Sequence, residues 1–144
     1  MIRIQEEPIE AERYLAPLRL QTVGAVVTFE GRTRRFSRGR EVDHLLYEAY
    51  RPMAEKEIGK LADEACRRWS LQGLVVVHRV GHVKVGECSV LIAAAAEHRR
   101  EAFEAVRYLL DTMKRTAPIW KKEVFKDDTN EAVWVESSDN LHGQ

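Results

Sequence analysis

Residues 114–123, Lys-Arg-Thr-Ala-Pro-Ile-Trp-Lys-Lys-Glu, form the joint between a helix and a strand near the end of the chain. The helical pattern cannot continue through Pro118, and a strand begins at the end of the joint. Four cations and a tryptophan lie in this joint, which is more charge than a turn requires. Cations held together in a partly desolvated pocket bind anions and alter the pKa values of the amines. The joint therefore predicts a site for an anionic substrate.

Outward from the joint, strands and helices alternate along the chain. Apolar residues with a period of 3.6 mark the helices, and short apolar or β-branched runs mark the strands. From residue 42 onward the order is β-α-β-β-α-β, which predicts an α+β domain of two layers, with a mixed or antiparallel sheet and helices on one face. The predicted strands cover residues 23–30, 42–50, 73–79, 88–95, 123–126 and 131–136, and the predicted helices cover residues 8–18, 52–69 and 98–115.

Three details of this prediction concern packing. The strands over 23–30 and 42–50 are expected to pair as an additional hairpin, with the polar loop 31–39 at its tip. Glycines 81 and 86 are expected to flank a turn. The inner face of the helix over 98–115 is expected to carry Phe103, Val106, Leu110 and Met113.

The composition is that of one globular domain. Of 144 residues, 44% are hydrophobic and 32% are charged, and the formal net charge is zero, which excludes bulk attraction to nucleic acid or anionic membranes. We expect a single domain over 1–136 and a polar, mobile tail over 137–144. No apolar run approaches a membrane span and the N-terminus lacks the apolar stretch of a signal peptide, so the cytoplasm is the expected location. Cys66 and Cys88 form no CxxC motif and are expected to be free.

Two further basic clusters precede the joint. The loop 31–40 holds five arginines, which suit phosphate and carboxylate, but a solvated tip would have the same composition. An anion- or RNA-binding module that uses this loop is therefore an alternative function, although zero net charge and the lack of an aromatic-rich RNA-binding strand argue against it. Residues 98–100, His-Arg-Arg, start a helix, where basic residues oppose the helix dipole unless an anion binds. His78 and His82 lack cysteine or carboxylate neighbours in their turn, so no metal site is expected.

Several tracts of the chain together resemble one family. They occur in the order found in that family and cover the chain to about residue 136. The tracts are Gly24–Arg34, Tyr47–Tyr50 with Pro52–Ala54, His78–Gly81 with Gly86, His98–Arg99 with Ala102–Phe103, and Lys114 with Ala117–Glu123. On these residues the chain resembles the MoaE family, the large subunits of molybdopterin synthase. Glu97 departs from the pattern, since the family usually has a small residue before the histidine.

The resemblance implies a fold, an activity and partners. The family fold is an α/β hammerhead with an additional antiparallel subdomain, and two copies pair as a homodimer at the centre of a two-plus-two heterotetramer. A small ubiquitin-like subunit inserts its C-terminal Gly-Gly, carried as a thiocarboxylate, into the large subunit. The enzyme transfers two sulfurs to cyclic pyranopterin monophosphate and so forms the dithiolene of molybdopterin. No cofactor, metal, nucleic acid or membrane is expected to take part.

The resemblance also implies roles for individual residues. Lys114 is expected to lie against the thiocarboxylate, and Lys121 to give acid–base or electrostatic support to sulfur attack. Phe29 and Trp120 are expected either to form walls of the pocket or to belong to the core. Alternation along the strand predicts that Lys121 and Lys122 face opposite sides, one toward a site and the other toward solvent. The expected substrate-binding residues, some of them from a second protomer, are Arg34, His98, Arg99 and Lys122.

Overall fold

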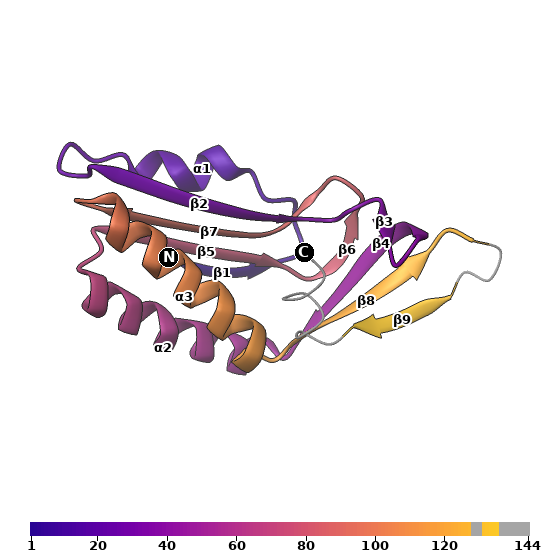
Figure 1. The fold of residues 1–144 in the computed structure, drawn as a ribbon. Helices are drawn as coiled ribbons and strands as arrows, with labels where there is room; N and C mark the ends of the chain where they lie inside the picture. Colours follow the sequence, from indigo (N-terminus) through magenta and orange to yellow (C-terminus); the bar gives the residue numbers. More distant parts are fainter. Residues whose placement is uncertain (128–130, 136–144) are drawn as a thin grey trace.

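Two β-sheets placed end to end form the frame of the molecule (Figure 1). The computed structural model describes residues 1–127 and 131–135. The first sheet has the strand order β1 (Ile2–Gln5), β5 (Gly73–Arg79), β7 (Cys88–Ala96) and β2 (Ala25–Arg32). Strand β1 runs parallel to β5, and the other pairs are antiparallel. The second sheet has the order β3 (Phe36–Ser37), β4 (Arg40–Ala49), β8 (Ile119–Phe125) and β9 (Ala132–Val135), and β6 (Gly81–Lys84) also pairs with β4.

Helices cover both faces of the first sheet (Figure 1). The long helices α2 (Arg51–Trp69) and α3 (Arg99–Thr116) lie side by side on one face. The short helix α1 (Ala11–Leu15) and the 3-10 turn η1 (Ala16–Leu18) lie on the other face. No helix of the described residues is long and apolar enough to cross a membrane.

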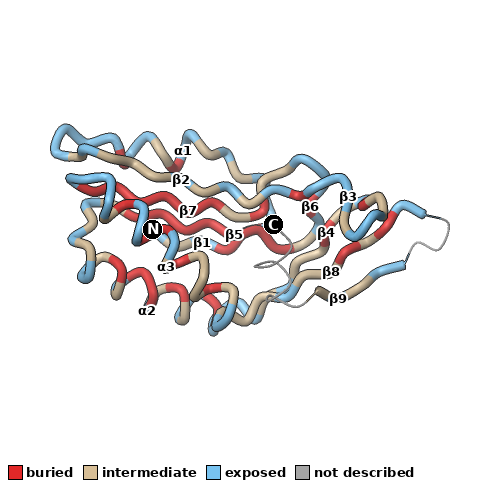
Figure 2. The backbone as a smooth tube through the Cα atoms, viewed as in Figure 1, coloured by how far each residue is buried: buried red, intermediate tan, exposed pale blue. Residues whose placement is uncertain are grey.

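Strand β5 shows why helices are needed on both faces. Its side chains alternate, so Val76 packs in one core cluster with Ile58 of α2 and Leu109 of α3, whereas Val77 packs in another with Tyr14 of α1. All of these residues are buried, as the central strands in Figure 2 show. Burial of each large apolar side chain contributes about 1.5–3 kcal/mol, so this doubly covered sheet is a stable base for the second sheet that extends from it.

The α+β prediction is confirmed, with the second sheet as the additional antiparallel part. The strands predicted over 73–79 and 88–95 are β5 and β7, which pair with each other, and α2 and α3 lie within about one residue of their predicted bounds. The two-layer prediction holds for the long helices, and the short α1 and η1 add a partial third layer.

The predicted hairpin between the strands over 23–30 and 42–50 is wrong. Strand β2 pairs with β7 in the first sheet, and β4 pairs with β6 and β8 in the second. Pairing with β7 places Val26 and Val27 of β2 opposite Ala95 and Ala94, which are fully buried. The arginine-rich loop is also not a simple tip, because its second half forms a hairpin of β3 and β4. Arg38 and Gly39, at φ 54° and φ 76°, make the two-residue turn, a conformation that glycine adopts without strain.

Three further differences concern shorter segments. Residues 81–84, predicted as part of a turn, form β6 because β4 offers them a free edge, and β1 was not predicted at all. Phe103 is 61% exposed, so its assignment to the inner face of α3 is wrong. Val106 and Met113 are buried on that face as predicted, together with Ala102, Ala105 and Leu109. The last predicted strand is confirmed over Ala132–Val135, while residue 136 and the tail over 137–144 lie outside the described residues.

Candidate active site

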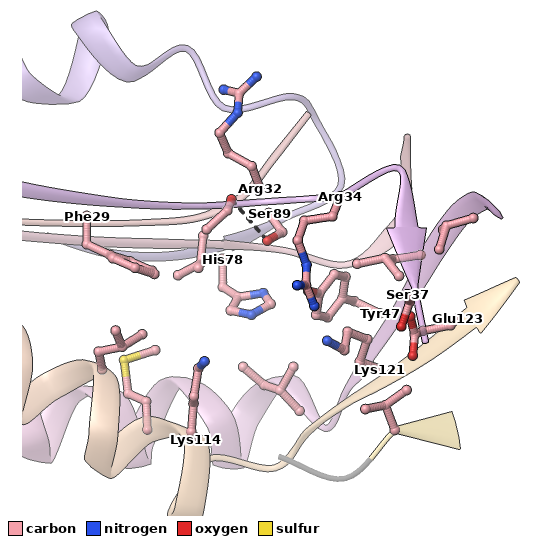
Figure 3. A pocket seen from close by; sticks show the side chains of 18 of the residues that line it. Phe29, Arg32, Arg34, Ser37, Tyr47, His78, Ser89, Lys114, Lys121 and Glu123 are labelled. Carbon is pink, nitrogen blue, oxygen red and sulfur yellow. Dashed lines mark hydrogen bonds between the residues drawn. The ribbon is translucent and has the colours of Figure 1, made fainter. Parts of the chain in front are cut away.

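A pocket lies where the two sheets meet the C-terminal end of α3 (Figure 3). Its floor comes from the first sheet, its far wall from β4 and β8 of the second, and its near wall from the last turns of α3. The polar side chains that line it are Arg32, Arg34, Ser37, Tyr47, His78, Ser89, Lys114, Lys121 and Glu123, and the apolar ones include Phe29, Val90, Leu110 and Met113.

Lys114 and Lys121, which the sequence predicted as catalytic, both line this pocket. Lys114 lies in the last turn of α3, and Ala117, with extended backbone, ends the helix so that the chain can enter β8. In β8, alternate residues face the pocket, namely Ile119, Lys121 and Glu123. Figure 3 shows both lysine side chains pointing into the same space. The joint of residues 114–123 therefore places two amines in one pocket.

The environment of these amines favours their neutral form. Burial lowers the pKa of Lys121 to about 8; Glu123 opposes this shift, and the positive charges of Lys114, Arg34 and Arg38 add to it. Burial also lowers the pKa of Lys114, and Asp111 opposes the shift. With a pKa of about 8, the amine of Lys121 can hold or release a proton under working conditions, which is the requirement for acid–base chemistry.

Arg34 and Phe29 also lie in the pocket, as the sequence predicted. Arg34 follows β2, and its guanidinium points toward His78 and Lys121 in Figure 3. Phe29 of β2 is half-buried and gives the pocket an apolar wall at the end nearer Lys114. An apolar wall beside converging cations suits a ligand that has both a ring system and an anionic group.

Most of the other arginines of the loop 31–40 have partners within the chain. Arg32 pairs with Glu30, and Arg35 pairs with Glu41. Arg40 pairs with Asp127 and Glu131, and its guanidinium also lies 3.8 Å from the centre of the Phe125 ring. These ion pairs offset part of the positive charge of the loop, so the structure gives no support to an RNA-binding loop.

Lys122 and Trp120 lie on the opposite face of β8, outside the pocket. Lys122 Nζ lies 4.5 Å from the centre of the Trp134 ring, and Trp120 is 53% exposed. This placement agrees with the predicted alternation of Lys121 and Lys122. The structure thus does not bring Lys122 or Trp120 into contact with the space that Lys121 faces.

His98 and Arg99 lie at the other end of α3. His98 is the N-cap residue and Arg99 the first residue of the helix, and both are exposed. At 1.5 Å per residue, the 15 residues from Arg99 to Lys114 span roughly 22 Å of helix, so these side chains cannot reach the pocket of their own chain. The two sets of predicted site residues therefore lie at opposite ends of one rigid element.

Six polar residues of the pocket were not predicted as site residues: Arg32, Ser37, Tyr47, His78, Ser89 and Glu123. Burial raises the pKa of Tyr47, and a hydrogen bond with Ser89 opposes the shift. Glu123 is buried and lies on the same face of β8 as Lys121. The signal for Tyr47 and Glu123 was their position on the same strand face as apolar neighbours, but strand pairing was needed to show what that face meets.

Neither cysteine is arranged as a nucleophile. Burial raises the pKa of Cys88 to about 11 and also raises the pKa of Cys66, so both thiols stay protonated at neutral pH. Both cysteines are free. Among the described residues there is no group of three or more metal-ligating side chains.

The chain is similar to proteins of one family over most of its length. The sequence model described as MoaE protein matches residues 4–116. A relative from Mesorhizobium japonicum, named molybdopterin synthase catalytic subunit, is 44% identical over 96% of this chain and 86% of its own length. The crystal structure of molybdopterin synthase from Staphylococcus aureus aligns with a TM-score of 0.82 at 37% identity, over 92% of this chain and 94% of that one.

A fourth similarity concerns the fold alone. A protein–protein complex of subunits 1 and 2 of molybdopterin-converting factor from Helicobacter pylori has a chain that aligns with a TM-score of 0.78 at 20% identity, over 94% of this chain and 90% of that one. None of these similarities supports the alternative of an RNA-binding module.

Proposed function

The chain belongs to the MoaE family, and from that premise we propose that it is the catalytic subunit of a molybdopterin synthase. In this proposal it transfers sulfur from the C-terminal thiocarboxylate of a small ubiquitin-like subunit to cyclic pyranopterin monophosphate. The observation that carries the proposal is the convergence of Lys114, Lys121 and Arg34 in one half-buried pocket with an apolar wall.

The charges of the pocket suit this reaction. The phosphate of the substrate and the thiocarboxylate are both anions, and their repulsion grows as water is excluded. Arg34 and the two lysines provide compensating positive charge in fixed positions, which costs no reorganisation when the anions meet. We assign Lys114 to the thiocarboxylate, Lys121 to acid–base or electrostatic support of sulfur attack, and Arg34 to the substrate. Phe29 would support the ring system.

The sulfur comes from the partner in this proposal. Cys66 and Cys88 have raised pKa values, so neither supplies a thiolate at neutral pH. A flexible C-terminal Gly-Gly has no side chains and can enter a narrow pocket as an extended strand. The chain itself then needs to position and polarise only two reactants.

The separation of the two clusters supports a homodimer with shared pockets. His98 and Arg99 lie roughly 22 Å from Lys114 along α3 and cannot serve their own pocket. In a symmetric dimer the same patch is used twice, so the helix start of each copy can complete the pocket of the other. We therefore propose that His98 and Arg99 bind substrate in the pocket of the second copy. One small subunit at each end gives a two-plus-two complex.

Reconstitution tests the proposal. The purified chain, the thiocarboxylated small subunit and cyclic pyranopterin monophosphate are expected to form molybdopterin together. The chain without the small subunit is expected to form none, because no thiolate of its own can donate sulfur. Replacement of both Cys66 and Cys88 by serine is expected to leave turnover unchanged in folded protein. Product formed without the small subunit or another sulfur source would show that the donor lies in this chain.

A further inference from the structure

The pocket contains one buried histidine that the proposed chemistry does not yet use. His78 lies near the end of β5, is 8% exposed and lines the pocket. Figure 3 shows its ring among the side chains of Arg34, Tyr47 and Lys114. It lies on the floor of the pocket, on the strand that the first sheet buries most fully.

The hydrogen bond of His78 defines its tautomer. Nδ1 lies 2.7 Å from the backbone oxygen of Arg79. A carbonyl oxygen can only accept, so Nδ1 carries the hydrogen and donates it. Burial lowers the pKa of His78 to about 4, with the bond to Arg79 opposing the shift, so the ring is neutral near pH 7. The other ring nitrogen, Nε2, is then a bare acceptor.

The ring is held in this orientation from two sides. Tyr47 contacts it edge-on, with ring centres 5.0 Å apart and planes at 75°. The Arg79 residue that accepts from Nδ1 is itself fixed, because its guanidinium donates to the backbone oxygens of Glu6 and His82, each at 3.0 Å. A hydrogen-bond partner that is fixed in this way determines which nitrogen of a histidine faces the site.

Nε2 of His78 has no hydrogen-bond partner among the described residues. Nε2 is not one of the fully buried polar atoms that lack a partner, so it is open to the pocket, where a ligand can supply a donor. The surrounding cationic groups, Arg34 and Lys114, can only donate. A phosphate oxygen would be repelled by the lone pair of Nε2 and attracted by these cations, whereas an N–H or O–H group would be bound by Nε2.

We infer that Nε2 of His78 accepts a hydrogen bond from an N–H or O–H group on the ring system of the substrate, and that this bond sets which way round the substrate lies. The heterocycle then faces β5, and the anionic group faces Arg34. The inference rests on the proposed function, because it takes a pterin as the ligand of this pocket.

Two substitutions at His78 distinguish the role of Nδ1 from the role of Nε2. His78→Asn places an amide N–H close to the position of Nδ1 and removes the acceptor, and His78→Gln places an amide oxygen close to the position of Nε2. Binding of cyclic pyranopterin monophosphate, measured by calorimetry, is expected to weaken about 10-fold or more in His78→Asn and only a few-fold in His78→Gln. The control is His82→Asn, since His82 is exposed on β6 and outside the pocket. Equal binding by wild type and His78→Asn would overturn the inference.

A pterin without phosphate tests the orientation. His78→Asn is expected to weaken its binding by the same factor as for the phosphorylated ligand, whereas Arg34→Ala is expected to weaken only the phosphorylated one. If His78→Asn weakened binding of the phosphorylated ligand but not of the bare pterin, the histidine would bind the phosphate, and the inference would be overturned.

NMR of the imidazole nitrogens tests the same inference on wild-type protein, so the result does not depend on whether a His78 variant folds. Free protein is expected to show the Nδ1–H tautomer, and addition of the pterin is expected to move the Nε2 resonance upfield. An unchanged Nε2 resonance in protein that binds the pterin would overturn the inference and leave the proposed function standing. Wild-type protein that neither binds pterin nor forms product with the small subunit would overturn both.

Discussion

Lys121 lies between two opposing influences. Its amine is buried beside the positive charges of Lys114 and Arg34, and the Glu123 carboxylate on the same strand face partly offsets them. The balance leaves its pKa at about 8, so the amine is mostly charged at neutral pH but loses its proton at low cost. The same side chain can therefore attract an anion and donate a proton during the reaction.

The pH dependence of the reaction tests this role. With Lys121 acting as the ammonium form, kcat/KM is expected to be level below about pH 7 and to fall above about pH 8, as the free enzyme loses that charge. Lys121→Arg is expected to retain charge at all working pH values and to lose this fall, whatever its absolute rate. A wild-type rate that instead rises through pH 8 would make Lys121 the base.

The same burial is expected to cost stability. The pKa of Lys121 is about 8 in the fold and 10.5 without it, so between those values the unfolded chain binds more protons and stability rises with pH. Lys121→Met is expected to stabilise the protein at pH 7 by roughly 2–3 kcal/mol, and the gain is expected to shrink toward pH 10.5. Urea unfolding at both pH values measures it, with Lys122→Met as control. A gain that is equal at both pH values would contradict the pKa assignment.

Alanine substitutions distinguish the two lysines that line the pocket, Lys114 and Lys121, from Lys122 on the opposite face of β8. Lys114→Ala and Lys121→Ala are each expected to lower turnover on the order of 100-fold, the scale for loss of an acid–base or electrostatic group. Lys122→Ala is expected to have little effect, because its amine packs on Trp134 outside the pocket. The reconstituted assay measures all three, and near-full activity in the first two would show that the site is elsewhere.

At the scale of single residues, the sequence predicted what depends on local rules. Pro118 ends a helix and alternation in a strand separates Lys121 from Lys122, so their placement followed from spacing. The role of His78 did not, because a buried histidine on an apolar strand has the same local sequence whether it faces core or pocket. Its environment depends on α3 and β4, which are distant in sequence.

Element bounds were also predictable where the pattern was regular, as in α2, α3, β5 and β7. The partners of β2 and β4 were not predictable, because these strands are neighbours in sequence but belong to different sheets. Phe103 was misplaced for a related reason. Helical spacing alone allowed it on the inner face, and only the packing of α3 against α2 and the sheet shows that Ala102, Ala105 and Leu109 occupy that face.

Two substitutions in α3 test this packing. Leu109→Ala is expected to destabilise the protein by about 2–5 kcal/mol, since Leu109 is fully buried and its removal leaves a cavity. Phe103→Ala is expected to cost well under about 1 kcal/mol, because the side chain is 61% exposed. Chemical unfolding of both variants measures the difference. A larger loss for Phe103→Ala would indicate that another surface covers it in solution.

At the scale of the whole molecule, the fold alone does not complete the proposed site. The sequence predicted both clusters of basic residues at the two ends of a helix over 98–115, but only the structure shows which cluster lines the pocket. The pocket of one chain contains Lys114, Lys121 and Arg34, whereas His98 and Arg99 lie at the far end of α3. A second copy is the element that brings the clusters together in our proposal.

Mixing two inactive variants tests the shared pocket. A Lys114→Ala chain lacks the amine of its own pocket. A chain with both His98→Ala and Arg99→Ala lacks the side chains that it would contribute to the pocket of its partner. After subunit exchange, a mixed dimer has one pocket with every residue intact, so random mixing is expected to restore about a quarter of wild-type activity. Light scattering at tens of micromolar is expected to show a dimer throughout. Exchange without any regained activity would show that each pocket is complete within one chain.

The span of α3 also has a genetic consequence. An allele that damages the Lys114 end and an allele that damages the His98 end would complement each other in one cell, although they lie in the same gene and even in the same helix. Two alleles at one end would not. A single allele that carries both lesions would lower the activity beside a wild-type copy to about a quarter, because every mixed dimer would contain one pocket without its amine and one without its borrowed cations. Whether two defective alleles complement each other would thus depend on which end of this 18-residue helix each one damages.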